Sequence, residues 1–169
     1  PQLGLISASF LWVYAFASPL AGYFADRLGH RRVVLFSLLV WSLVTALTGF
    51  ARSFGELLAA RALMGISEAF YIPAALAMIS THHPESTRAK AISLHQSGIY
   101  VGIVIGGAGG GWMGEHYGWR SAFYVLGAFG VIYGLFLFRT LQKAPATAAI
   151  TPPSRQHFIY SLSAIVRTP

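Results

Sequence analysis

The sequence predicts an all-α protein, a polytopic membrane helix bundle with five transmembrane helices. Of its 169 residues, 55% are hydrophobic and only 10% are charged, whereas a soluble domain carries about 25% charged residues. The lack of cysteine excludes a disulfide-stapled secreted domain, and the 14% aromatic content excludes a disordered chain. The apolar stretches do not alternate with a period of two, as short transmembrane strands would.

Five stretches are long enough to cross a membrane as helices. A span needs roughly 20 apolar residues, because the hydrocarbon core is about 30 Å thick and a helix rises about 1.5 Å per residue. The third stretch is apolar but contains Arg61 and Glu68, and the fourth is crowded with glycine. In chain order the predicted spans are residues 3–23, 33–51, 54–80, 91–113 and 121–138.

Charged residues mark the limits of three of these spans. The first has no charge until Asp26, and the second and fifth each lie between arginines. Charged side chains are expensive at the bilayer centre, so they collect where a helix leaves the hydrocarbon. The arginines that frame the second and fifth spans are Arg31, Arg32, Arg52, Arg120 and Arg139.

The net charge of +7 reports topology rather than nucleic-acid binding. A nucleic-acid interface needs Lys and Arg interleaved with polar and aromatic residues on one wet face, whereas here the basic residues cluster between uncharged stretches. If the loop after the first span is cytoplasmic, the opposite side holds only Arg52 and Arg120. The cytoplasmic side then holds Arg27, Arg31, Arg32, Arg88, Lys90, Arg139, Lys143, Arg155 and Arg167.

The two ends of the chain lead to two further expectations. The positive-inside rule places the first residue outside, and the sequence has neither an initiating Met nor a signal peptide. These two observations predict that a helix is missing upstream. We therefore expect the sequence to be a piece of a larger protein. Residues 139–169 are rich in proline, alanine and threonine, as a cytoplasmic linker would be. Within them, residues 156–166 fit a short amphipathic helix at the inner surface.

The loop between the first two spans concentrates charge and glycine. Gly22 allows another helix to approach closely, and Gly29 permits a tight reversal of the chain. Asp26 stands where a helix end meets water, free to pair with an arginine or to cap a neighbouring helix. Such a cluster can lock one arrangement of helices and release it in another. An ordinary basic inner loop is the alternative.

This loop resembles the signature of the major facilitator superfamily, Gly-x-x-x-Asp-Arg-x-Gly-x-Arg-Arg. The likeness extends to Gly118-Trp119-Arg120-Ser-Ala-Phe123 before the fifth span. It implies that the five spans are helices two to six of a twelve-helix transporter, with helix one and the carboxy-terminal half absent. It also implies a cytoplasmic gate formed by Gly22, Asp26, Arg27, Gly29, Arg31 and Arg32.

The third span holds a charged pair. Arg61 and Glu68 are seven residues apart, which is two turns along one helix face. Glu68 falls near the middle of the span. A charged side chain inside the hydrocarbon core costs several kcal/mol unless it faces a cavity or a partner, so such a residue is usually functional. A cavity of low dielectric favours the protonated form of a carboxylate, and the planar fork of arginine can bind a carboxylate bidentately. A buried pair that merely holds helices together is the alternative.

The Arg-x-x-x-Gly-x-x-Glu arrangement around Gly65 resembles the anion:cation symporter branch of that superfamily, which includes sugar-acid permeases and sialin-like proteins. The resemblance implies that Arg61 engages an organic anion and that Glu68 takes up the coupled proton. A similar Arg and Glu occur in spinster-type lipid transporters, the second branch that the chain resembles.

The fourth span contains a glycine ladder at a spacing of four residues. Such a stripe lets helices pack closely and slide, although static close packing is an equal alternative. The span has no proline, unlike the fifth helix of the drug-antiporter branch. His95, Gln96 and Tyr100 in this span, like Tyr14 and Tyr71, are candidates to line a cavity or to pack in the bundle. The ladder consists of Gly98, Gly102, Gly106, Gly110 and Gly114.

Enzyme and metal signals fail in their context. The segment 109–114 matches GxGxxG but ends a predicted membrane helix and follows no strand. His82 and His83 have no second ligand pair nearby, so neither a metal site nor a cofactor is predicted. There is no Walker loop, serine elbow or cysteine nucleophile.

These features together predict proton-coupled symport of a small organic anion, such as a sugar acid, by alternating access. Arg61, Tyr71, Gln96 and Tyr100 are the predicted substrate contacts, and Glu68 is the predicted proton carrier, with sodium as the alternative coupling ion. Efflux of lipids or drugs and a non-transporting membrane scaffold are the alternative functions. The predicted partners are the bilayer, the anion and the coupling ion, not nucleic acid, and the predicted location is a bacterial inner membrane.

Overall fold

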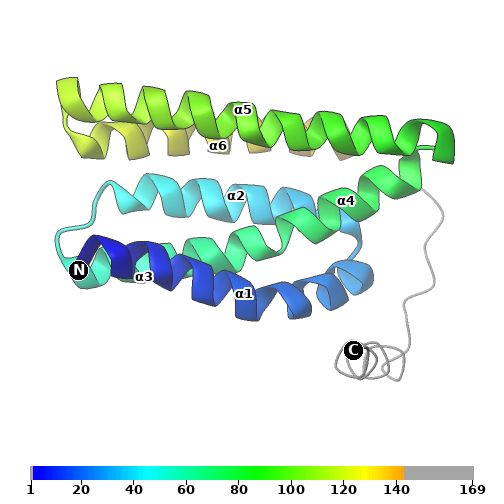
Figure 1. Cartoon of the computed structure of the whole chain (residues 1–169), viewed down its shortest axis with the longest axis horizontal. Coiled ribbons are helices and arrows are strands. Elements are labelled where there is room, and N and C mark those ends of the chain that lie inside the picture. Colours follow the sequence, from blue (N-terminus) through cyan, green and yellow to red (C-terminus); the bar gives the residue numbers. More distant parts are fainter. Residues whose placement is uncertain (1, 143–169) are drawn as a thin grey trace.

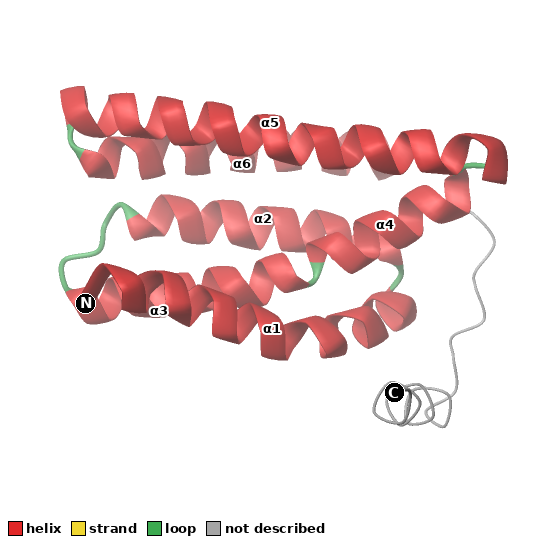
Figure 2. Ribbon diagram, in the orientation of Figure 1, coloured by secondary structure: helices red, strands yellow, loops and turns green. Residues whose placement is uncertain are grey.

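A computed structural model describes residues 2–142, and this part of the chain is entirely helical apart from short connections (Figure 2). Five stretches of helix are long and apolar enough to cross a membrane, which confirms the all-α membrane fold. The third span consists of two helices, α3 and α4. The helices are α1 (Gln2–Leu28), α2 (His30–Thr48), α3 (Phe54–Ala69), α4 (Tyr71–His82), α5 (Glu85–Tyr117) and α6 (Trp119–Gln142).

Most helices run further than the apolar stretches predicted. α1 continues to Leu28, so Asp26 and Arg27 lie in its last turn rather than in a loop. α2 begins at His30 but ends at Thr48, three residues before the predicted limit. Apolar composition reports the hydrocarbon core alone, whereas backbone hydrogen bonding continues into the headgroup region, where charged side chains are solvated.

The carboxy-terminal part of the chain is only partly described. α6 continues through Gln142, so the first four residues of the predicted linker at 139–169 are helical. This is a correction of the linker's starting point. The predicted amphipathic helix at residues 156–166 lies outside the described residues.

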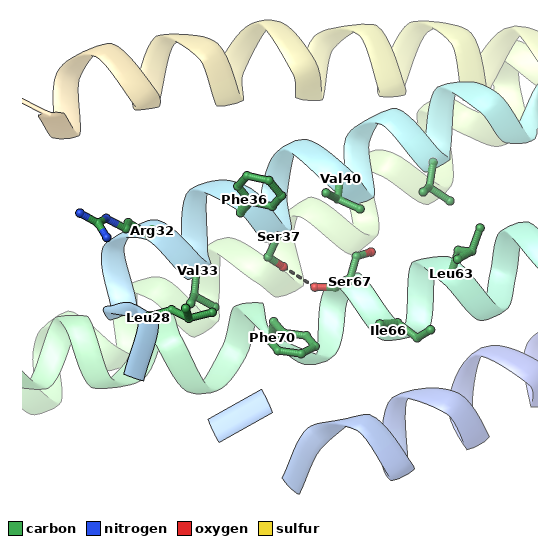
Figure 3. Close-up of a pocket in the computed structure, with 11 residues that line it drawn as sticks. Leu28, Arg32, Val33, Phe36, Ser37, Val40, Leu63, Ile66, Ser67 and Phe70 are labelled. Carbon is green, nitrogen blue, oxygen red and sulfur yellow. Dashed lines mark hydrogen bonds between the residues drawn. The ribbon is translucent and has the colours of Figure 1, made fainter. Parts of the chain in front are cut away.

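The third span is interrupted at Phe70, between α3 and α4 (Figure 2). Pro73 has no N–H to donate to the carbonyl of Ala69, and its ring crowds that carbonyl. Pro19 lies inside α1 without breaking it, so a proline alone is not sufficient to interrupt a helix of this protein. At the interruption the hydroxyl of Ser37 in α2 donates to the backbone carbonyl of Ser67, replacing a bond that a continuous helix would make (Figure 3).

α2 occupies the centre of the bundle (Figure 1). It packs against α6 on one side and against α3 and α4 on the other, while α1 packs mainly on α3. α5 lies beside α6 and touches the end of α4. α5 has no buried residue in the described structure, whereas eight residues of α2 are buried. The core therefore lies around α2, where Val33, Val34, Ala74 and Ala75 pack together.

Three glycines of α6 allow its close approach to α2. A Cβ atom added at Gly127 would clash with the backbone of Ala46, and one at Gly134 would lie 2.7 Å from Leu39 Cδ2. A Cβ at Gly130 would clash with the side chain of Ser42. These glycines are three or four residues apart and form one stripe, as close packing between membrane helices requires.

Side chains from α6 hold the connection between α2 and α3. Tyr124 Oη donates to the carbonyl of Gly49 at 2.7 Å, and Arg120 Nη2 donates to the carbonyl of Ala51 at 2.9 Å. Ser53 caps α3 by accepting from the amide of Glu56, whose carboxylate accepts from the amide of Arg52 at 2.7 Å. These two hydrogen bonds at the amino-terminal end fix where α3 starts and so set the register of the third span.

Candidate functional site

The charged pair predicted from the sequence lies on one face of α3. Arg61 and Glu68 are both partly buried, and they interact electrostatically. No ion pair within 4 Å joins them in the described structure, and the Arg61 guanidinium contacts Met64 Sδ at 3.8 Å. The strong hydrogen-bonding capacity of both groups is therefore available to a third partner.

Gly65 brings this face of α3 against α1. A Cβ atom at Gly65 would lie 2.7 Å from the carbonyl oxygen of Phe10 and 3.3 Å from the amide of Tyr14. Any larger residue would therefore push α1 and α3 apart. Tyr14 lies at this helix contact and stacks on Phe10.

An aromatic and polar cluster lies just beyond the interruption of the third span. Tyr71, the first residue of α4, packs edge-on against Trp41 of α2, with 5.6 Å between ring centroids. On its other side Tyr71 contacts the ring of His95 in α5 at 5.9 Å. The structure therefore brings α2, α4 and α5 together around Tyr71, three residues after Glu68.

Three polar side-chain atoms of α5 are buried without a hydrogen-bond partner among the described residues. They are Nε of Arg88, Nε2 of His95 and Oε1 of Gln96. A buried polar group without a partner costs roughly 1–3 kcal/mol, so such groups are normally satisfied by water or a ligand. Tyr100, one turn further along α5, is 65% exposed. The structure thus half-buries the predicted contact Gln96 and leaves the predicted contact Tyr100 exposed.

The predicted glycine ladder does not pack against another helix along most of its length. Nothing lies within 4 Å of a Cβ added at Gly98, Gly102 or Gly106. Only the last two members come near α6: Gly110 meets Ala122 at 3.9 Å, and Gly114 meets the backbone of Trp119 at 3.8 Å. Among the described residues, the glycines that set close contacts between helices are Gly65, which belongs to the Arg-x-x-x-Gly-x-x-Glu arrangement, and the three glycines of α6. The sequence analysis did not single out the glycines of α6.

The predicted cytoplasmic gate is a helical corner rather than an extended loop. Gly29 has φ of +87°, a conformation that favours glycine, and it alone separates α1 from α2. Asp26 pairs with His30 at 3.1 Å, one turn away across the corner, and with no arginine in the described structure. Arg27 lies over the ring of Tyr23 at 4.6 Å.

The other gate residues lie at the same corner. Arg31 and Arg32 are in the first turn of α2. Nothing lies within 4 Å of a Cβ added at Gly22, so no helix in the described structure uses the space beside it. The corner is therefore held by the pair of Asp26 with His30, a contact that the sequence did not predict.

The described residues contain no group of three potential metal ligands among His, Cys, Asp and Glu. The arrangement instead offers a guanidinium and a carboxyl group two turns apart on α3, followed by a phenol, an imidazole and a carboxamide. Such a set can bind an anion, accept its hydroxyl groups and exchange a proton.

A comparison with protein families decides the family. The model described as "Major Facilitator Superfamily" matches residues 1–169. The chain belongs to the Major Facilitator Superfamily. It is thus a multi-pass integral membrane protein of a transporter family, not an enzyme, as the motif at its first helical corner predicted.

Curated relatives within the superfamily are named as transporters of anions. The chain is 39% identical over 136 residues to "Probable anion transporter 1, chloroplastic" of Oryza sativa subsp. japonica, covering 79% of this chain and 26% of the relative. It is 31% identical over 150 residues to "D-galactonate transporter" of Escherichia coli O6:H1, covering 89% of this chain and 35% of the relative. The chain thus spans about a quarter to a third of these relatives.

Solved structures of a bacterial homolog of the human lysosomal transporter Spinster have a similar fold. The inward-facing unoccupied form matches with a TM-score of 0.75 at 26% identity, covering 99% of this chain and 42% of that one. The inward-facing occupied form matches with a TM-score of 0.71 at 27% identity, covering 90% and 37%. Both of the branches that the sequence resembles therefore appear among the matches.

Proposed function

We propose that residues 1–169 form part of the amino-terminal half of a secondary active transporter that moves a small organic anion, such as a sugar acid, by proton-coupled symport. Arg61 binds the carboxylate of the substrate and Glu68 takes up the coupled proton. Tyr71, Gln96 and Tyr100 contact the remainder of the substrate. The residues at the corner of α1 and α2 act as the cytoplasmic gate, and the bacterial inner membrane is the proposed location.

The partly buried Arg61, which has no carboxylate within 4 Å in the described structure, is the observation on which the proposal rests. An arginine inside a membrane span needs an anionic partner or a wet cavity. Glu68 on the same face does not satisfy it as an ion pair. A substrate carboxylate would do so, with both oxygens bound by the guanidinium fork.

The relatives support a carboxylate as the anion. "D-galactonate transporter" and "Probable galactarate/D-glucarate transporter GudP" of Escherichia coli are both named for sugar acids. A sugar acid offers one or two carboxylates for Arg61 and several hydroxyl groups. The unpaired Nε2 of His95 can donate to or accept from such a hydroxyl, and the unpaired Oε1 of Gln96 can accept from one.

Binding of D-galactonate to the complete reading frame that contains residues 1–169 tests this role of Arg61. Arg61→Lys keeps the charge but loses the bidentate fork, so we expect affinity to fall about 10- to 100-fold, the equivalent of one charged hydrogen bond. Arg52→Lys is the matched control, because Arg52 lies at the membrane surface before α3 and should bind as the parent protein does. Unchanged affinity in Arg61→Lys would make Arg61 a purely structural residue.

Lipid export is the second candidate function. It is favoured by the match to the bacterial Spinster homolog in both occupied and unoccupied forms. The two functions predict opposite directions of net movement relative to the proton gradient. Accumulation of D-galactonate inside vesicles supports uptake, whereas lipid appearing in the opposite leaflet without sugar-acid uptake supports export.

A further inference from the structure

An apolar groove of about 510 Å³ runs along α2 and α3 (Figure 3). Phe36 and Val40 of α2 form one wall, and Leu63 and Ile66 of α3, with Phe70 directly after it, form the other. Successive helix residues turn by about 100°, so these α3 residues project from the side opposite Arg61 and Glu68. The groove is therefore separate from the proposed substrate site.

The groove has a basic mouth. Arg32 lines its end at the corner of α1 and α2, and a second groove of about 490 Å³ is lined by both Arg31 and Arg32. The acid at this corner, Asp26, is already paired with His30. The amino-terminal end of α2 adds the positive end of its helix dipole at the same point, and Gly29 provides no side-chain cap. The mouth thus suits an anion.

The length of the groove matches one leaflet of a membrane. From Arg32 to Val44, the two ends of its α2 wall, the helix rises about 18 Å. Half of a hydrocarbon core is about 15 Å deep. A molecule with its charged end at Arg32 would therefore have its apolar end near the bilayer centre. Free phosphate has no apolar end to fill this space.

We propose that this groove binds an anionic phospholipid, with the phosphate at Arg32 and one acyl chain along Phe36, Val40 and Ile66. The second groove, which shares Arg32 and Phe36 with the first, holds the other acyl chain. A bound lipid fills the space between α2 and α3 at the point where the third span is interrupted. The site depends on the membrane side that holds the basic residues, where anionic headgroups attract arginine.

Photocrosslinking in vesicles tests the site. The protein is reconstituted in phosphatidylcholine containing a minor fraction of phosphatidylglycerol whose acyl chain carries a photoreactive group, and the labelled peptides are mapped by mass spectrometry. We expect labels on α2 and α3 at the groove, suppressed by unlabelled phosphatidylglycerol and not by added phosphatidylcholine. Equal competition by the two lipids would overturn the proposal, since it would mean that the groove holds bulk acyl chains without headgroup selection.

Two variants separate the acyl and headgroup contacts. Val40 is 38% exposed, so Val40→Trp fills the groove without entering the core, and we expect at least a tenfold loss of labelling there. Val101→Trp on α5, where the side chain is 55% exposed, is the matched control. Arg32→Gln should reduce the preference for phosphatidylglycerol about fivefold, the worth of one basic side chain at an anionic surface, whereas Arg52→Gln should not. Labelling that survives Val40→Trp would refute the site.

Discussion

Ser37 of α2 donates a buried hydrogen bond to the backbone carbonyl of Ser67, three residues before the interruption of the third span. The carbonyl belongs to the last turn of α3, where a helix end leaves its acceptors without intrahelical donors. A side chain of one helix thus completes the backbone of another inside the membrane.

We expect Ser37→Ala to lower the free energy of unfolding by about 1–3 kcal/mol, because it leaves the Ser67 carbonyl buried without a partner. The measurement is denaturant unfolding of the protein in detergent, followed by far-UV circular dichroism. Ser9→Ala is the control, since the Ser9 hydroxyl bonds only to Ile6 within its own helix. Equal and small effects of the two variants would show that the carbonyl finds another donor.

Gly65 provides the second prediction. In Gly65→Ala the new methyl group would meet the Phe10 carbonyl oxygen at 2.7 Å, so α1 and α3 must separate. We expect a loss of about 1–3 kcal/mol in unfolding free energy from this overpacking. Gly102→Ala adds the same methyl group where nothing lies within 4 Å, and it should be neutral or slightly stabilising in helix α5. The same loss in both variants would contradict the close contact.

Pro73 leads to a prediction about the trade-off between stability and transport. Pro73→Ala restores an amide that can bond to Ala69, so we expect a higher unfolding midpoint together with slower transport, because Tyr71 would turn away from His95 and Trp41. Pro19→Ala in α1 is the control, since that helix is already continuous. Thermal unfolding and substrate uptake are measured on the same preparations. Faster transport with reduced stability would refute this role for the interruption.

The sequence predicted the five spans and the superfamily because both depend on local signals. Hydrocarbon thickness dictates a run of apolar residues, and the motif around Asp26 and Gly29 is contiguous. The helix ends extended beyond the prediction, because α1 tolerates Asp26 and Arg27 in its last turn at the headgroup level. Apolar composition carries no information about that region.

The features that the sequence missed depend on which helix faces which. The ladder of five glycines on α5 was the more regular pattern, yet the glycines of α6 are those that meet α2. Spacing identifies a stripe of small residues but not its partner. Pro73 is a sequence signal for the interruption at Phe70. The hydrogen bond from Ser37 to the Ser67 carbonyl could not be predicted, because it depends on how α2 packs against α3. Likewise, the pairing of Asp26 with His30 depends on how the corner at Gly29 turns.

Glu68→Gln tests the central claim, that this carboxyl group couples anion transport to the proton gradient. The complete reading frame containing residues 1–169 is reconstituted in vesicles, and D-galactonate is followed with and without an imposed proton gradient. We predict that Glu68→Gln abolishes accumulation against the gradient of D-galactonate but retains part of the exchange of internal for external substrate. Glu115→Gln, at the far end of α5, should accumulate normally. Full accumulation by Glu68→Gln would contradict the account and remove Glu68 from the coupling mechanism.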